Sequence, residues 1–240
     1  MIPAPAFLAN PDRFMAFSRW AAPMFGAIAV LLGVAGLWLG FSAPEDYQQG
    51  DTIRIMFIHV PAAWLALFIY SCLGGASLLA LVFRHRLADA AAQAAAPLGA
   101  AFTFLALVTG SLWGRPMWGA WWVWDAKLTS VLVIFLFYVA YMALRAALDD
   151  EAKAARAAAI LALVGLVNLP VVHFSVNWWN TLHQGSSVLT HGALPPVYAR
   201  PLALMCLAYL AAFGALWLVR IRGELWRRRA EAAALRMADA

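Results

Sequence analysis

The stretch "AAPMFGAIAVLLGVAGLWLGF", residues 21–41, decides the class of fold, because it is apolar throughout and long enough to cross a membrane. A membrane-spanning helix needs about 20 mainly apolar residues. Five further stretches meet this requirement or come close to it: residues 62–83, 94–113, 128–144, 157–174 and 201–219. None of these stretches contains Asp, Glu, Lys or Arg. We therefore predict an all-α integral membrane protein with six transmembrane helices.

The composition supports this prediction and excludes several classes of protein. Of the 240 residues, 65% are hydrophobic and 12% are charged, whereas about 25% of the residues of a soluble domain are charged. Cys72 and Cys206 lie in apolar runs, so we expect neither a disulfide framework nor a thiolate metal site. There is no CxxCH motif for covalent haem attachment and no GxxxxGK[ST] motif for ATP hydrolysis. No repeat, long linker or cleaved signal peptide is visible, so we predict one membrane domain over residues 1–240.

The positive charges predict the orientation in the membrane. Of the 17 Lys and Arg residues, only Arg54, Arg115, Lys127 and Arg200 lie in the loops of one side, and all the others lie on the opposite side with both termini. Cytoplasmic loops carry the excess of Lys and Arg, so both termini are predicted to be cytoplasmic. The outward loops are then residues 42–61, 114–127 and 175–200. Because the net charge of +5 reflects topology, nucleic acid is not an expected partner.

The outward loops are the expected place for a functional site. Proton relays and ion pathways need ionisable groups inside the membrane, and the predicted spans offer only His173, near the outer end of residues 157–174. The stretch "WGRPMWGAWWVWDAKLTS", residues 113–130, holds five of the 12 tryptophans. Nine tryptophans lie on the predicted outer side and three on the inner side. An interfacial aromatic belt should populate both sides, so a belt alone explains this distribution poorly.

The tryptophan-rich stretch could present a flat aromatic surface. If it is helical, Trp118, Trp121, Trp122 and Asp125 fall at positions i, i+3, i+4 and i+7 of one face. Such a platform, which Trp124 would extend, suits a flat apolar ligand because stacking adds to the gain from burial. Asp125 also directly precedes an apolar run and could cap the helix that begins there. The two roles do not exclude each other.

Two histidines in different outward loops are candidate metal ligands. His59 lies two residues before Pro61, and because proline favours the first turn of a helix, we expect His59 at the outer mouth of the second span. The positive end of the helix dipole would keep its ring neutral and able to bind a metal. His183 follows a tryptophan pair in the third outward loop. A single surface histidine more often only donates or accepts a hydrogen bond, but two beside an aromatic platform favour metal ligation.

A planar, apolar ligand whose iron has two open axial positions fits this combination, and we therefore expect non-covalent, b-type haem with two histidine ligands. The two propionates of haem need cationic partners. Arg54 and Arg115 are the first candidates, with Lys127 and Arg200 as the other outward cations.

The sequence resembles the haem exporter protein C family of cytochrome c maturation, whose members contain a tryptophan-rich haem-handling segment. The resemblance rests on the six-span layout and on "APEDYQQGD" (43–51), "HVPAAW" (59–64), residues 113–130 and "NLPVVHFSVNWWNTLHQGSS" (168–187). It implies a protein of the bacterial inner membrane that is not an enzyme. It also implies that His59 and His183 are axial ligands, that Trp118, Trp121, Trp122, Trp124 and Asp125 form the haem-binding segment, and that the site faces the periplasm.

The resemblance further implies a set of partners. These are an ABC-type ATPase with its membrane subunit, a small single-span protein, and a periplasmic haem chaperone that receives the haem. Two alternatives remain open: a quinol-oxidising subunit that transfers electrons through b-type haem, and a haem-conducting channel. No role is predicted for His173 or His191.

Overall fold

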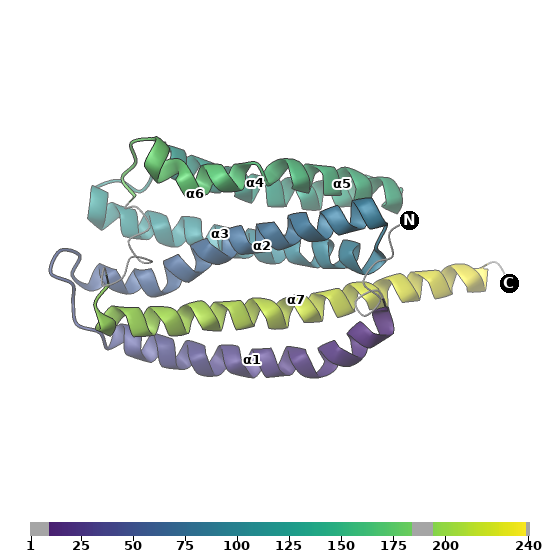
Figure 1. Ribbon diagram of the computed structural model, residues 1–240, viewed down its shortest axis with the longest axis horizontal. Coiled ribbons are helices and arrows are strands. Elements are labelled where there is room, and N and C mark those ends of the chain that lie inside the picture. The colour runs from purple at the N-terminus through teal and green to yellow at the C-terminus, as the bar shows by residue number, and fades with distance from the viewer. Residues whose placement is uncertain (1–9, 184–193, 239–240) are drawn as a thin grey trace.

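The computed structural model describes residues 10–183 and 194–238 and shows a bundle of helices that run roughly side by side (Figure 1). Its elements are α1 (Pro11–Phe41), the 3-10 helix η1 (Asp51–Ile55), α2 (Met56–Phe83), α3 (Arg86–Trp118), α4 (Ala126–Ala147), α5 (Glu151–Gly165), α6 (Asn168–Trp178) and α7 (Pro196–Ala238). Six helical segments are long and apolar enough to cross a membrane, with α5 and α6 together forming one of them. The predicted all-α fold with six spans is confirmed.

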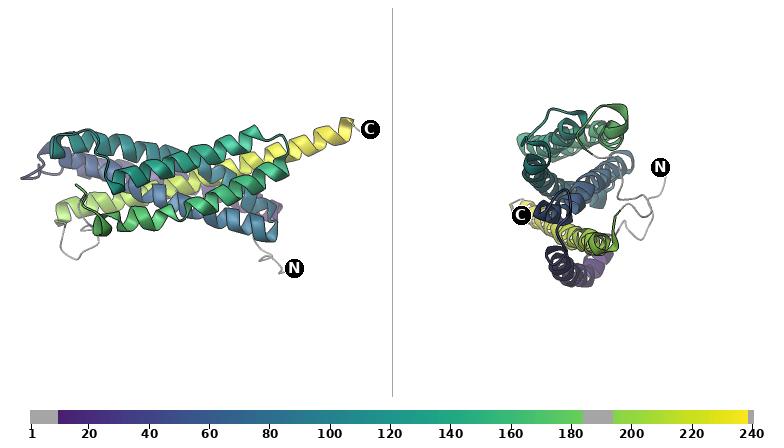
Figure 2. Two further views of the ribbon diagram at one scale, coloured as in Figure 1. Left: turned by 90° about the horizontal axis from the view of Figure 1, so that it is seen from above. Right: turned by 90° about the vertical axis from the view of Figure 1, so that its left-hand side faces the viewer.

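The helices form a layered bundle whose outermost layer is α1. α1 packs chiefly against α7, which in turn contacts α2 and α3 (Figure 2). α4, α5 and α6 cover the opposite side. The start of α1 and the end of α7 lie at the same end of the bundle (Figure 1), which agrees with six crossings. We call this the terminal end, and the opposite one the loop end.

α1, α3, α4 and α5 each begin after a residue whose side chain caps the helix. The Oδ1 atom of Asn10 accepts a hydrogen bond from Asp12 N at 2.8 Å, and Pro11 occupies the first position of α1. Asp150 caps α5 by accepting from Ala152 N at 2.9 Å and from Lys153 N at 3.0 Å. Such caps satisfy amide groups that have no partner inside the helix.

The span predicted for residues 157–174 is not one continuous helix, because α5 ends at Gly165 and α6 begins at Asn168. Pro170 explains the break, since it cannot donate to the carbonyl of Leu166 and its ring would collide with that carbonyl. Asn168 Nδ2 donates to the Ser130 carbonyl at 2.8 Å and so attaches the start of α6 to α4.

Other helix ends also differ from the predicted spans. α3 continues to Trp118, past the residue where we expected an outward loop, and α2 begins at Met56 rather than near Pro61. α7 extends from Pro196 to Ala238, well past the predicted end at residue 219. Hydropathy predicts the apolar centre of a helix, whereas polar caps and prolines decide where the helix ends.

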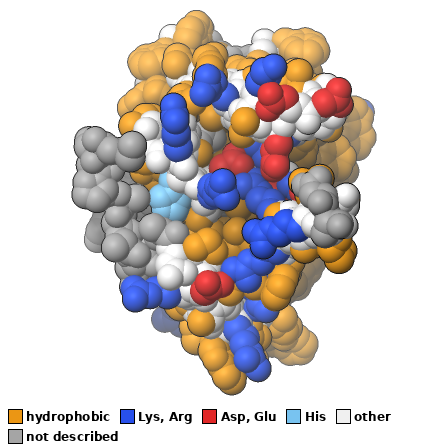
Figure 3. Space-filling view, turned by 90° about the vertical axis from the view of Figure 1, so that its right-hand side faces the viewer, with side chains coloured by type: hydrophobic (Ala, Val, Ile, Leu, Met, Phe, Trp, Pro, Cys, Tyr) orange, Lys and Arg blue, Asp and Glu red, His pale blue; other side chains and the backbone are white. Residues whose placement is uncertain are grey.

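Small residues let the central helices approach closely, and ion pairs join them at the terminal end. A Cβ atom at Gly99 of α3 would overlap the Tyr138 ring of α4, so that glycine leaves the space the ring fills. At the terminal end Asp89 pairs with Arg145 at 2.8 Å and with Arg228 at 2.6 Å. Figure 3 shows the basic and acidic side chains that gather on this end. The Lys and Arg residues that were predicted to share one side with both termini gather at this end.

The substitution Gly99→Ala should destabilise the bundle, because the added methyl group would displace the Tyr138 ring from a packed core. We expect a loss of roughly 1–3 kcal/mol, seen as a lower midpoint of thermal unfolding in detergent. Gly75→Ala is the matched control, since its Cβ would have no atom within 4 Å. Equal midpoints for the two variants would contradict the packing described for Gly99.

Candidate functional site

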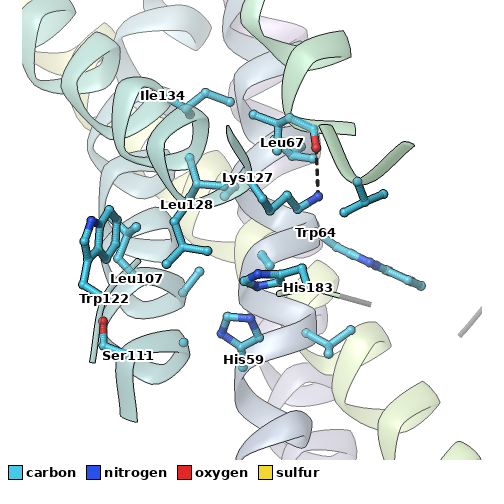
Figure 4. A pocket seen from close by; sticks show the side chains of 18 residues that line it. His59, Trp64, Leu67, Leu107, Ser111, Trp122, Lys127, Leu128, Ile134 and His183 are labelled. Carbon is cyan, nitrogen blue, oxygen red and sulfur yellow. Dashed lines mark hydrogen bonds between the residues drawn. The ribbon is translucent and has the colours of Figure 1, made fainter. Parts of the chain in front are cut away.

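Two cavities meet at the loop end of the bundle. The candidate ligands His59 and His183 each line both cavities. The outer cavity has a volume of about 790 Å³. It is bordered by the segment between α1 and η1, by the last turns of α3 and by the first turn of α7. The inner cavity, drawn in Figure 4, has a volume of about 220 Å³ and lies between α2, α3, α4 and α6. Val60 and Gly110 complete the wall that the cavities share.

His59 lies in the first turn of α2, which begins at Met56, so Pro61 is inside the helix and not in the first turn as predicted. The Nδ1 atom of His59 lies 3.1 Å from Thr109 Oγ1 on α3. The Thr109 hydroxyl donates to the Leu105 carbonyl at 2.7 Å, which uses its only proton. Thr109 Oγ1 therefore accepts a hydrogen bond from His59 Nδ1–H, and the lone pair of His59 Nε2 is left free. A hydrogen bond on one ring nitrogen is the usual support of a histidine that binds metal through the other.

The surroundings of the His59 ring also restrict its position. The edge of the ring packs against Trp113 with centroids 5.7 Å apart. A Cβ atom at Gly110 would lie 2.9 Å from His59 Cε1, so only glycine allows the ring to approach α3 this closely. A hydrogen bond holds Trp113 in turn, because its Nε1 group donates to Gln49 Oε1 at 3.1 Å. The segment between α1 and η1 and the helix α3 thus both restrict the position of the His59 ring.

His183 lies in the segment that follows α6, at the loop end of the bundle. Its backbone N–H donates to Thr181 Oγ1 at 3.1 Å, and its ring lies 5.0 Å from the Trp118 ring, centroid to centroid. Its Nδ1 atom is buried without a hydrogen-bond partner in the described part of the chain. Burial lowers the pKa of His183, and the charge of Lys127 acts in the same direction, although Asp125 opposes them. The ring is therefore neutral near pH 7 and keeps a lone pair for a ligand.

Residues 119–125 do not form the helix that the aromatic platform requires. α3 ends at Trp118, Gly119 adopts a left-handed conformation with φ of 76°, and α4 begins only at Ala126. The helical face predicted through residues 118–125 is therefore wrong. Glycine ends the helix here because it takes this conformation without steric cost.

The tryptophans of this stretch point in different directions. Trp118 lines the outer cavity and Trp122 lines the inner one, where its Nε1 group is buried without a hydrogen-bond partner among the described residues. Trp121 and Trp124 are 57% and 75% exposed and line neither cavity. The structure thus brings Trp118 and Trp122 to the histidines, and Trp121 and Trp124 lie outside.

Asp125 connects two segments of the site. Its Oδ1 atom accepts from Leu128 N at 2.7 Å and caps α4, which confirms the capping role that the sequence indicated. Its Oδ2 atom accepts a hydrogen bond from the hydroxyl of Thr181. Asp125 therefore reaches the site through Thr181 rather than through the platform expected from its spacing.

Of the cations considered as propionate partners, some line a cavity and others do not. Arg54 pairs with Asp51 at 2.6 Å, and Arg115 donates to the carbonyl of Gly119; neither lines a cavity. Lys127 does line the inner cavity, where its Nζ donates to the Val172 carbonyl at 2.9 Å (Figure 4). Lys127 is thus the cation that the fold brings to the histidines.

The remaining histidines do not join this pair in the described structure. His173 is exposed on α6 beside Phe174 and lines neither cavity. His191 lies outside the described residues. Thr109 and Thr181 could not be predicted as site residues, because the sequence around a threonine in an apolar helix or a loop does not reveal its hydrogen-bond partner.

The arrangement is suited to one kind of ligand. Among residues 10–183 and 194–238, no group of three or more His, Cys, Asp or Glu side chains could hold a metal ion. Two neutral imidazoles are sufficient, however, for an iron that a planar ring already holds on four sides. Trp113 and Trp118 add apolar walls beside them. The outer cavity also has the volume of a small-molecule site, roughly 300–1,000 Å³.

Comparisons with known proteins agree on one family. The family model for Heme exporter protein C matches residues 5–236. The chain is 54% identical to Heme exporter protein C of Bradyrhizobium diazoefficiens over 224 residues, which are 92% of this chain and 85% of that protein. It is 48% identical to the Escherichia coli K12 protein of the same name, over 90% of this chain and 88% of that protein. It is 46% identical to Heme exporter protein C of Paracoccus denitrificans, over 92% of this chain and 93% of that protein.

The substitution Asp125→Ala should destabilise α4, because Leu128 N would lose its capping acceptor. We expect a loss of about 0.5–2 kcal/mol, measured as a lower midpoint of thermal unfolding in detergent. Asp125→Ser should retain most of the stability, since serine also caps helices well. If alanine and serine lowered the midpoint equally, the capping role would be contradicted.

Proposed function

The chain belongs to the Heme exporter protein C family, and we propose that it binds haem between His59 and His183 and presents it for transfer. As a member of this family it is a multi-pass membrane protein that handles haem in cytochrome c maturation, a transport component and not an enzyme.

The observation that carries the proposal is the meeting of two neutral imidazoles from distant segments at one wall. His59 comes from the start of α2 and His183 from the segment after α6, yet both line the same two cavities, of which Figure 4 shows the inner one. The two residues are far apart in the sequence, and only the packing of the helices brings them to the same wall. Imidazole is a common axial ligand of haem iron.

Two further features fit haem as the ligand. The free Nε2 lone pair of His59 and the unpartnered, buried Nδ1 of His183 provide nitrogen atoms without other partners in the described structure. A buried polar atom without a partner is costly unless a ligand satisfies it. Trp113 and Trp118 flank these rings and offer surfaces on which a porphyrin can pack.

We propose that Lys127 is the principal cation for a haem propionate. It lines the inner cavity beside both histidines, and its only hydrogen bond in the described structure is to Val172 O. An ammonium group has three donors, so two of them remain for a carboxylate. Arg54 and Arg115 are second candidates, because each would first have to leave Asp51 or the Gly119 carbonyl.

We further propose that the loop end faces the periplasm of a bacterium and that the termini lie in the cytoplasm. The basic side chains gathered at the terminal end support this orientation (Figure 3). The family resemblance supports a complex with an ABC-type ATPase, its membrane subunit and a small single-span protein. The haem would pass to a periplasmic chaperone, and ATP would be hydrolysed by the partner.

The variants His59→Ala and His183→Ala should each lose most of the haem that co-purifies with the wild-type protein. Each removes one axial ligand, so the remaining haem should change from a low-spin to a high-spin absorption spectrum. Haem content and spectra of the purified proteins measure this directly. His173→Ala is the matched control and should retain the wild-type spectrum, since His173 is exposed and away from both cavities.

Unchanged haem spectra in both ligand variants would overturn the assignment of the ligands. Rapid redox cycling of the bound haem with quinol, without transfer to an acceptor, would instead favour the electron-transfer alternative.

The variant Lys127→Met should bind haem about tenfold more weakly, because one propionate would lose a charge-assisted hydrogen bond. Titration with haem and with haem dimethyl ester, which carries no carboxylate, isolates this contact. Wild type should prefer haem to the ester, and Lys127→Met should bind both alike. Lys127→Arg should keep the preference because it keeps the charge; the same preference in Lys127→Met would show that another residue holds the propionate.

A further inference from the structure

The two candidate ligands are supported in different ways. His59 is part of α2, and its ring is bonded to Thr109 of the neighbouring α3. His183 lies in no helix, and its ring has no hydrogen bond in the described structure. A residue of a helix that spans the bundle moves little, whereas a residue of a loop is held only by the contacts of that loop. The position of His183 therefore depends on the few bonds made near it.

One short chain of hydrogen bonds joins His183 to the rigid part of the bundle. The backbone N–H of His183 donates to Thr181 Oγ1 at 3.1 Å. The Thr181 hydroxyl donates its proton to Asp125 Oδ2. The other carboxylate oxygen, Asp125 Oδ1, accepts from Leu128 N at 2.7 Å in the first turn of α4.

The chemistry of these bonds gives Thr181 a defined role. A hydroxyl has one proton and two lone pairs, so Thr181 can donate to the carboxylate and accept from the amide at the same time. The bond to Asp125 is charge-assisted and hence stronger than a neutral one. The first turns of α4 are fixed in turn by α6, because Lys127 Nζ donates to Val172 O at 2.9 Å and Asn168 Nδ2 donates to Ser130 O at 2.8 Å. Thr181 thus transmits the position of α4 to the backbone of His183.

We infer that Thr181, held by Asp125, is a positioning residue that keeps His183 where it would bind the haem iron, so that loss of this contact would speed the release of haem. The inference rests on the proposed function, since it takes His183 to be a ligand. Thr181 itself lines neither cavity, so it acts through His183 and not on the haem. His59 would keep its position if this contact opened, because Thr109 on α3 holds the His59 ring independently of Thr181.

The test compares Thr181→Val with Thr181→Ser in the full-length protein loaded with haem. Valine has nearly the shape of threonine but cannot bond to Asp125 or to His183 N–H, whereas serine can do both. Thr52→Val is the matched control, because the Thr52 hydroxyl also donates within an outward segment, to Gln49 O at 2.6 Å, but has no bond to either histidine. Two quantities are measured: the low-spin fraction of the absorption spectrum and the rate at which haem passes to an excess of a haem-scavenging apoprotein.

For Thr181→Val we expect a high-spin fraction and haem dissociation that is at least roughly tenfold faster than in wild type. Addition of free imidazole should restore the low-spin spectrum, because it replaces a ligand that has moved away. Thr181→Ser and Thr52→Val should match wild type in both quantities. A purely structural role for Thr181 would lower the unfolding midpoint without changing the spin state.

A wild-type spectrum and dissociation rate in Thr181→Val would overturn the inference, and so would a failure of Thr181→Ser to restore them. If Thr181→Val does not fold, Asp125→Asn replaces it. Its Oδ1 can still cap α4, but its amide cannot accept the Thr181 proton. The same two quantities then decide. Failure of the proposed function is distinguishable, because the wild-type protein itself would then lack the low-spin spectrum.

Discussion

The membrane imposes the constraint on which the rest of this structure depends: a backbone polar group in the hydrocarbon region must find its partner within the protein. An unpaired group there costs several kcal/mol. The chain meets this demand with helices that continue across nearly the whole bundle. Where a helix is interrupted, at Gly165–Asn168, turn hydrogen bonds and the contact of Asn168 with Ser130 O join the two parts. Irregular backbone otherwise appears at the ends, and the loop end is where the site lies.

Because irregular backbone lies at the ends of the apolar helices, the candidate site is built from short polar contacts between those ends. Thr109, Thr181 and Asp125 are small polar residues whose bonds orient His59 or His183. These bonds are partly buried, and burial strengthens a hydrogen bond because less water competes for the groups. The ion pairs of Asp89 at the opposite end join α3 with α4 and α7 without any contact to the cavities. One end therefore holds the helices together, and the other presents the two imidazoles.

Much of the fold and part of the candidate site could be predicted from the sequence. Hydropathy found the six spans, since an apolar run of sufficient length has few alternatives in a membrane. Spacing and residue type also indicated His59 and His183 as candidate ligands and Asp125 as a cap, and the structure brings the two histidines to one wall. The helical platform of residues 118–125 was wrong, because Gly119 ends α3 in a left-handed conformation that the i, i+3, i+4 spacing does not reveal.

What the sequence determined by itself is therefore the class of protein, the number of spans and the residue types available for chemistry, because these depend on composition and local pattern. Only the tertiary structure decided which of those residues meet. Trp118 and Trp122 lie at the cavities while Trp121 and Trp124 are exposed, and Lys127 reaches the inner cavity while Arg54 and Arg115 are engaged elsewhere. The hydrogen bonds that join Asp125, Thr181 and His183 could likewise be seen only in the tertiary structure. Such contacts join segments far apart in the chain, and their geometry follows from helix packing, which no local pattern encodes.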